Sequence, residues 1–180
     1  MSSPIVSGIS AMFAQSLEVL SKPSVATFER FEKSGTLTDA AIYVGVTAAI
    51  AGVLGLVNGL GGFVSGILST LIGFFVFTAL VYYIGRSQGG TGTFNEVAYS
   101  FSLFWVPISV LVAVIGFVLL ITIIGILLLP LLGILAIIAE VWFGYMAVQA
   151  SMNITESSKI WVTLILSGIA ALAVRLVFRI

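Results

Sequence analysis

Glu140 is the side chain whose type and position could do chemistry, because it interrupts a long apolar stretch. It shares a helical face with Gly133 and Gly144, so it should point into a helix bundle. A carboxylate inside a membrane costs a few kcal/mol and marks a functional site by default. It could relay a proton or a cation, or it could be protonated and hydrogen-bonded to a neighbouring helix. Asn58 is a second candidate for an intramembrane polar site.

The residue types on which most enzyme sites depend are missing. The chain has no Cys and no His, and Asp39 is its only Asp. This composition excludes thiolate and imidazole metal sites, Ser-His triads and proteases built on two Asp residues. We therefore predict a non-enzymatic protein without a cofactor or a metal. Seven basic and seven acidic residues cancel, so no basic excess indicates nucleic acid as a partner.

The elements that must position these residues are membrane helices. The 180 residues are 60% hydrophobic and 8% charged, with a mean hydropathy of +1.26, whereas soluble domains carry about 25% charged residues. From Val97 to Ala139 the only ionisable side chain is a Tyr. A helix over 97–149 would measure about 80 Å, against a hydrocarbon core of ~30 Å. Length alone therefore predicts two spans here, with a turn between Leu119 and Ile124.

We predict an all-α integral membrane bundle of five transmembrane helices, formed by residues 39–180. Its spans are expected at 40–57, 63–84, twice within 97–149, and at 160–178, with a tight turn at 58–62 and polar loops at 85–96 and 151–158. A five-span domain places its termini on opposite sides of the bilayer. The inner segments would hold five basic residues (Lys22, Arg30, Lys33, Arg86 and Lys159), and the outer side would hold two, Arg175 and Arg179. Because cytoplasmic segments carry more Lys and Arg, this asymmetry predicts N-inside, C-outside.

Residues 1–38 are predicted as a cytoplasmic amphipathic segment of two helices. Lys22-Pro23 separates the helices, and Ser24 is suited to cap the second. Thr36 and Asp39 have the spacing of a capping box before the first span. This segment either binds the membrane surface or a partner, or simply covers the cytoplasmic end of the bundle.

Small residues recur at alternating spacings of four and three along the first two spans. In lipid, no hydrophobic force pairs helices, so small residues are needed to bring backbones close. This pattern therefore predicts a tightly packed antiparallel hairpin. The glycines expected at the contact are Gly45, Gly52, Gly59, Gly62, Gly66 and Gly73.

Arg175 is the cation to consider as a partner for Glu140. At ~1.5 Å per residue, Glu140 lies about 13 Å and Arg175 about 24 Å from the inner ends of their spans. This difference in depth argues against direct pairing, and we expect Arg175 to reach the outer interface. Pro107 and Pro130 each free a backbone carbonyl in mid-span. Such kinks are common structural features and also occur at transport sites.

The segment from Gly89 to Pro107, GGTGTFNEVAYSFSLFWVP, resembles the Yip1 family. It has a Gly-rich loop, a Phe, and an aromatic stretch leading to a Pro in the third span. The segment LSKPSVATF, from Leu20 to Phe28, is similar to that family's Pro-containing segment before the membrane. For eukaryotic members the resemblance implies vesicle transport and binding of prenylated Rab-type GTPases. This compact, Cys-free chain looks more like prokaryotic members, which implies the cytoplasmic membrane (an endomembrane if eukaryotic).

The leading hypothesis is a Yip1-like, multi-pass membrane protein that acts through association with lipid, with a protein partner or with itself as a homo-oligomer. The candidate interaction surface is the cytoplasmic face, comprising Phe28, Arg30, Phe31, Arg86, Phe94 and Glu96. Arg86 and Glu96 are expected to be close enough to pair across their loop. The alternative hypothesis is a small oligomeric transporter or channel, with Glu140, Asn58 and the two mid-span prolines along its pathway.

Overall fold

The computed structural model describes residues 4–178, and every regular element within this range is helical. The chain contains no strand over these residues, as the sequence predicts. The elements in order are α1 (Pro4–Ser21), α2 (Val25–Phe31), α3 (Leu37–Gly55), the short 3₁₀ helix η1 (Leu56–Asn58), α4 (Gly59–Ser87), α5 (Phe94–Leu120), α6 (Ile123–Met152) and α7 (Ser157–Phe178).

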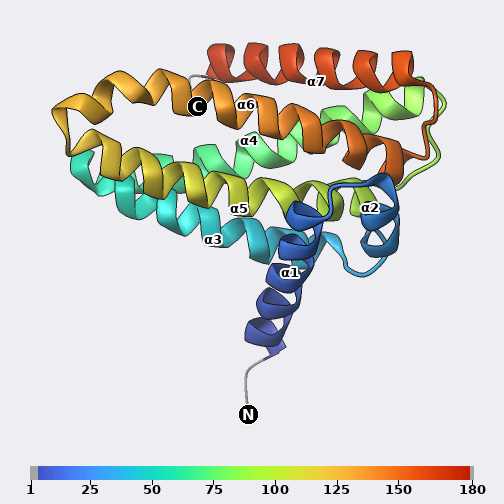
Figure 1. Cartoon of the computed structure of the whole chain (residues 1–180), viewed down its shortest axis with the longest axis horizontal. Helices are drawn as coiled ribbons and strands as arrows, with labels where there is room; N and C mark the ends of the chain where they lie inside the picture. Colours follow the sequence, from blue (N-terminus) through green and yellow to red (C-terminus); the bar gives the residue numbers. More distant parts are fainter. Residues whose placement is uncertain (1–3, 179–180) are drawn as a thin grey trace.

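The helices α3 to α7 run back and forth along the long axis of the molecule (Figure 1). Helix α3 packs against α4 and α5, α5 packs against α6, and α7 lies on α4 and α6. Helix α1 crosses the bundle at a steep angle and contacts α5 and α3, while α2 packs against α6 (Figure 1). The N-terminal segment therefore covers one end of the long helices.

Side-chain caps fix where several helices begin. The Ser24 hydroxyl accepts a hydrogen bond from the Thr27 amide at the start of α2. Thr36 with Asp39, and Thr93 with Glu96, form complete capping boxes at the starts of α3 and α5. These caps satisfy backbone N–H groups that have no partner within the helix. The first two caps are therefore where the sequence predicts them.

The turn between α5 and α6 lies at residues 121–122, inside the predicted interval. The Thr122 hydroxyl accepts a hydrogen bond from the Gly125 amide and so caps α6. Both Pro107 and Pro130 lie inside continuous helices. The predicted polar loops are shorter than expected, because α4 extends to Ser87 and α6 to Met152.

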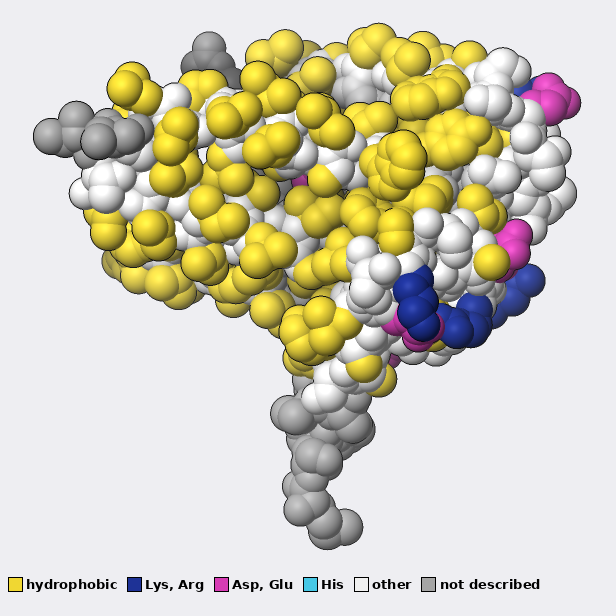
Figure 2. Space-filling model, viewed as in Figure 1, with side chains coloured by type: hydrophobic (Ala, Val, Ile, Leu, Met, Phe, Trp, Pro, Cys, Tyr) yellow, Lys and Arg dark blue, Asp and Glu magenta, His cyan; other side chains and the backbone are white. Residues whose placement is uncertain are grey.

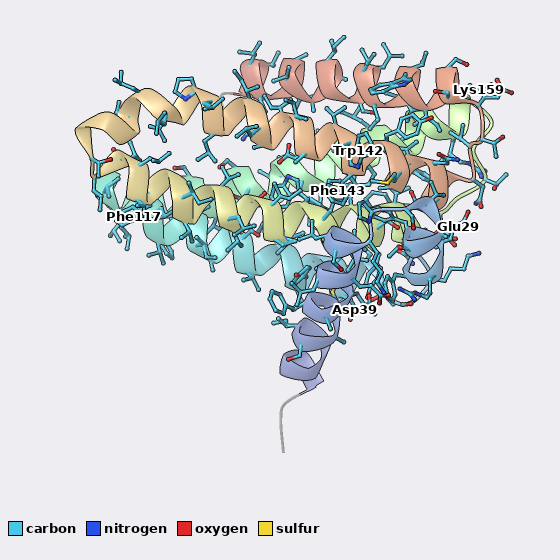
Figure 3. The ribbon with its side chains drawn as sticks, viewed as in Figure 1. Glu29, Asp39, Phe117, Trp142, Phe143 and Lys159 are labelled. Carbon is cyan, nitrogen blue, oxygen red and sulfur yellow. The ribbon has the colours of Figure 1, made fainter. Side chains whose placement is uncertain are left out.

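Four stretches within residues 4–178 are long and apolar enough to cross a membrane: Leu37–Ser87, Phe94–Leu120, Gly125–Met152 and Ser157–Val177. The first is 51 residues long and includes the two antiparallel helices α3 and α4 with η1 between them. Figure 2 shows an almost continuous apolar surface over the long helices, with charged side chains gathered at one end. Figure 3 places Glu29 and Lys159 at that end and Phe117 at the opposite end. The chain is thus an integral, multi-pass membrane protein.

Helices α3 and α4 form a hairpin with direct backbone contact. A Cβ built on Gly55 would overlap the carbonyl group of Gly62, and one built on Gly66 would lie 2.5 Å from the carbonyl oxygen of Ala51. A Cβ on Gly52 would lie 2.8 Å from the side chain of Ile67. Only glycine allows these approaches, which in lipid replace the missing hydrophobic force between helices.

Three glycines expected at this contact do not lie there. Nothing lies within 4 Å of a Cβ built on Gly45, Gly59 or Gly73. Gly59 instead has a φ of +78° and makes the turn between η1 and α4, a conformation that a residue with a Cβ rarely adopts. The two helices meet closely only near their shared turn, so the stripe of small residues is longer than the contact.

The best-packed core lies where α1 and α2 meet the long helices. Phe28 of α2 is fully buried, and its ring meets Phe104 of α5 edge-on with centroids 6.1 Å apart. The Tyr99 hydroxyl donates a hydrogen bond of 2.8 Å to the side chain of Gln15 on α1. These contacts fix the N-terminal segment to the bundle.

Candidate functional site

A pocket of about 500 Å³ lies between α4, α5, α6 and α7. Figure 2 shows a hollow in the apolar face of the molecule, with an acidic side chain visible inside it. The wall is mostly aliphatic and aromatic, with a few polar groups. Its lining residues are Ser69, Thr70, Ile72, Gly73, Phe74, Val76, Phe77, Phe101, Phe104, Trp105, Ile137, Glu140, Val141, Trp161, Leu164, Ile165, Gly168, Ala171, Leu172, Val174 and Arg175.

Aromatic contacts hold three walls of the pocket in place. Phe104 of α5 stacks on Phe143 of α6 with ring centroids 5.8 Å apart. Trp105 of α5 contacts Phe74 of α4 at 5.1 Å. Small residues leave the space itself open, since nothing lies within 4 Å of a Cβ built on Gly73 of α4 or on Gly168 of α7. The pocket therefore has a packed base and an unfilled interior.

Glu140 stands in the wall of this pocket, on the middle part of α6. Its side chain is half-buried. Within the described residues it makes no hydrogen bond and no ion pair with the protein. An acidic side chain in a membrane normally faces the bundle interior and finds a partner there. Glu140 lines the pocket between the helices, and within the described residues its carboxylate has no such partner.

Arg175 lines the same pocket from α7. The two side chains form no ion pair. From the sequence, we expected Arg175 at the outer interface and did not expect it to share a cavity with Glu140. The depth of each residue along its own helix does not show how the two helices pack. The structure brings both charges to one pocket because α7 lies across α4 and α6.

Asn58 lies away from this site. It ends η1 at the turn between α3 and α4 and is exposed, and it does not line the described pocket. Pro107 and Pro130 are also absent from the lining. The structure therefore does not bring together the set of residues expected along a transport pathway. Ser69 and Thr70 are the polar wall residues that sequence reasoning missed, and each hydroxyl donates to the Gly66 carbonyl.

The candidate cytoplasmic face is only partly a surface. Phe28 is fully buried, so its assignment to an exposed face is wrong. A seven-residue helix shows which side is apolar, but not that this side packs under another helix. Phe31 is half-buried and packs against the core. Arg30 stays exposed, pairs with Glu18 of α1, and lies 4.5 Å from the centre of the Phe31 ring.

The other members of this face lie on either side of the loop 88–93: Arg86 near the end of α4, and Phe94 and Glu96 at the start of α5. Glu96 accepts a hydrogen bond of 2.7 Å from the Thr93 amide and forms no ion pair with Arg86, contrary to expectation. The Glu96 carboxylate binds in the cap because Thr93 is only three residues away, so this contact does not require a longer loop to close. The Arg86 guanidinium donates instead to the Gly90 carbonyl at 3.4 Å. The half-buried Phe94 contacts the Tyr82 ring at 5.9 Å.

Glu32 is a buried charge near this face that sequence reasoning did not single out. Its side chain is 5% exposed, one carboxylate oxygen lies 3.5 Å from the Lys33 ammonium group, and the other oxygen has no hydrogen-bond partner. Burial raises the pKa of this carboxyl above its usual range, with Glu96 and Glu29 adding to the rise and Lys33 opposing it. Nothing in the local pattern of α2 distinguishes this glutamate from its exposed neighbour Glu29.

Comparison with known proteins assigns the chain to a family. The family model described as the Yip1 domain matches residues 17–177. This range includes α2, nearly all of the long helices and the pocket, together with the last turn of α1. No curated protein and no solved structure matches the chain. The match covers most of the sequence and agrees with the resemblance carried by its Gly-rich loop and aromatic segment, and so the chain belongs to the Yip1 domain family.

Proposed function

We propose that this Yip1-domain protein is a non-enzymatic membrane protein that holds a membrane lipid in the pocket between α4, α5, α6 and α7. One observation carries the proposal: a largely apolar pocket of about 500 Å³ contains an acidic side chain that has no partner among the described residues. Its rim includes the exposed apolar residues Ile137, Ile165 and Leu172. A bilayer around these helices would bring lipid chains directly to that rim.

The driving force for occupancy is packing. Within a bilayer, moving an apolar chain into an apolar pocket gains no hydrophobic free energy, because lipid tails are already apolar. An empty pocket, however, leaves its wall atoms without contacts on one side and loses dispersion energy. A lipid chain restores those contacts, and polar wall groups such as Glu140 can fix its orientation by hydrogen bonding.

Five membrane crossings, with the N-terminus inside, complete the proposal. The alternating directions of α3 to α7 support five crossings (Figure 1). The end with α2 and the loops 88–93 and 153–156 carries most of the charge. A hydrogen bond of 2.9 Å from the Thr91 amide to the Met152 carbonyl joins the loop 88–93 to the end of α6. Arg175 lies toward the other end of α7, and Arg179 lies outside the described residues.

Single-cysteine labelling tests this orientation, and the absence of native Cys makes it direct. Exposed positions at the two ends are available: Ser87 and Ser158 at the charged end, Val57 and Ile121 at the other. In intact cells an impermeant maleimide should label Val57→Cys and Ile121→Cys, and should label the two serine positions only after lysis. The reverse pattern would exclude the N-inside orientation.

The cytoplasmic end is also proposed as the site for a protein partner. Its exposed basic groups, Arg30 and Arg86, support this assignment. Recovery of a partner should fall when both are changed to Gln, and should not change in the matched Lys159→Gln variant at the same end. Unchanged recovery in the double variant would exclude these two residues from the contact. Self-association is a further proposal, which the mass of the reconstituted protein would test.

Filling the pocket tests lipid binding. Gly73 and Gly168 face open space, so Leu at both positions would occupy the pocket without striking backbone. Native mass spectrometry of the full chain, purified from membranes, should show retained lipid in the wild type and less in this double variant. Gly45→Leu is the matched control, because Gly45 also has open space but lies outside the pocket lining. Equal lipid retention in the folded double variant would contradict the proposal.

A further inference from the structure

We propose that Arg175 binds the phosphate of the lipid headgroup, so that the pocket selects a phospholipid with a net negative headgroup from the leaflet at the Arg175 end. This inference rests on the proposed lipid-binding function and adds to it the headgroup and the leaflet. It depends on the length of the pocket and on the difference between its two ends.

The pocket extends lengthwise along α7. Its lining residues on this helix begin at Trp161 and end at Arg175. At ~1.5 Å per residue this is about 21 Å, more than the ~15 Å depth of half a hydrocarbon core. A pocket of this length can hold a lipid chain parallel to the helix and still reach the interface at one end. The headgroup would then lie at whichever end provides its partner.

Among the described residues that line the pocket, Arg175 is the only cation, and it lies at one end. At the other end the nearest cation, Lys159, forms an ion pair of 2.7 Å with Glu156. Trp161 contacts the ring of Tyr145 at 5.4 Å, and the Tyr145 hydroxyl donates to Ser157. Arg175 is exposed and makes no hydrogen bond or ion pair with any described part of the chain. The polar groups at the first end are therefore largely satisfied, and Arg175 is not.

The chemistry of the arginine identifies the group that it would bind. A guanidinium group binds phosphate through two parallel hydrogen bonds, which an ammonium group cannot do. Among the described residues, Glu140 is the only carboxylate in the pocket lining. By helix rise it lies about 18 Å from the end of α6, whereas Arg175 lies about 27 Å from the start of α7. The carboxylate is thus deeper than the guanidinium and does not neutralise it.

A net negative headgroup fits this arrangement better than a zwitterionic one. Both kinds present a phosphate, but the zwitterionic headgroup also brings an ammonium group close to the arginine, where like charges repel. Within residues 4–178 the pocket lining offers no second carboxylate near Arg175 to hold that ammonium group. The site should therefore prefer phosphatidylglycerol to phosphatidylcholine with identical chains.

A competition experiment tests the preference. The full-length protein in detergent would be given equimolar phosphatidylglycerol and phosphatidylcholine of identical chains, and native mass spectrometry would report the ratio of the bound lipids. The wild type should bind phosphatidylglycerol in excess. Arg175→Gln should reduce this excess roughly tenfold, because the charge that repels the zwitterionic ammonium group is gone, and lipid should still be retained by the apolar walls. Lys159→Gln, a matched loss of one charge at the other end, should keep the wild-type ratio.

The outcomes separate this inference from the function on which it rests. An unchanged ratio in folded Arg175→Gln overturns the headgroup assignment and leaves lipid binding intact, whereas a wild type that retains no lipid overturns both. Arg175→Lys keeps the charge but loses the paired hydrogen bonds to phosphate, so a preserved excess of phosphatidylglycerol with less total bound lipid supports the assignment even if the Gln variant does not fold. Excess inorganic phosphate should not remove the preference. If it does, the site binds a free anion and not a lipid headgroup.

Discussion

Glu140 of α6 and Arg175 of α7 line one pocket without forming an ion pair. Two opposite charges in a low-dielectric region attract strongly unless the helices hold them apart. Here the helix packing separates them along the length of the pocket. The pocket therefore has a polar group part-way along its wall and a cation at one end, an arrangement suited to an amphiphilic ligand.

Replacing Glu140 with Gln should not destabilise the protein. The carboxyl has no protein partner among the described residues, and an ionisable group in a membrane helix costs a few kcal/mol. Gln keeps the shape and removes the charge, so the midpoint of thermal unfolding in lipid-free detergent should stay the same or rise. A clear fall in this midpoint would show that Glu140 has a structural partner.

Replacing Gly62 with Ala should destabilise the hairpin of α3 and α4. The added Cβ would overlap the carbonyl group of Gly55, which is backbone and cannot move alone. Forcing such a contact apart costs about 1–3 kcal/mol. Gly45→Ala is the matched control, because its Cβ enters open space, and it should be neutral or stabilising by up to ~1 kcal/mol. Thermal scans followed by circular dichroism would compare the two, and equal midpoints would rule out the close contact.

Replacing Phe28 with Ala should loosen the N-terminal segment from the bundle. Its fully buried ring packs edge-on against Phe104, and loss of a buried Phe costs about 3–5 kcal/mol. Phe13 on α1 is 53% exposed, so Phe13→Ala should have a much smaller effect. Limited proteolysis would measure the difference as faster cleavage between α2 and α3. The same cleavage rate in both variants would show that Phe28 does not hold this segment in place.

Glu32 should make stability depend on pH in the opposite sense to an ion-paired acid. Its pKa in the folded protein is raised by burial, with Glu96 and Glu29 contributing and Lys33 opposing. Below the unfolded value, about 4.3, both states are protonated and folding carries no penalty. As the pH rises from there through the folded pKa, the unfolded state releases its proton more readily and stability falls. Above the folded pKa the full penalty remains.

Glu32→Gln should remove this dependence. The variant should be more stable than the wild type at neutral pH, and the difference should shrink as the pH falls through the folded pKa toward the unfolded pKa. Thermal unfolding across that pH range measures the difference. Glu156→Gln is the control at the same end of the molecule, because Glu156 is exposed and is not among the groups that shift the pKa of Glu32. A wild type that gains stability with rising pH relative to the Gln variant would contradict the assignment.

The capping boxes show which structural features local sequence can determine. Thr36 and Asp39 set the start of α3 through bonds that span three residues, so their spacing alone predicts the cap. The turn at 121–122 follows in the same way from a bilayer of fixed thickness and a helix of fixed rise. These features depend on neighbours in the chain or on the membrane, and no knowledge of packing is needed.

The sequence by itself determined the membrane class and the helical fold through its long apolar stretches, and it determined the family through the Gly-rich loop and the aromatic segment that follows. The expected inward direction of Glu140 came from periodicity, which shows which residues share one face of a helix. Only the tertiary structure decided that Gly62 touches the opposite backbone while Gly73 lines a pocket. It also decided that Phe28 is buried and that Arg175 shares a cavity with Glu140. The physical reason is that periodicity gives the orientation of each helix about its own axis. Periodicity does not show which helix lies next to a given helix, and it does not show at what depth two packed helices move apart.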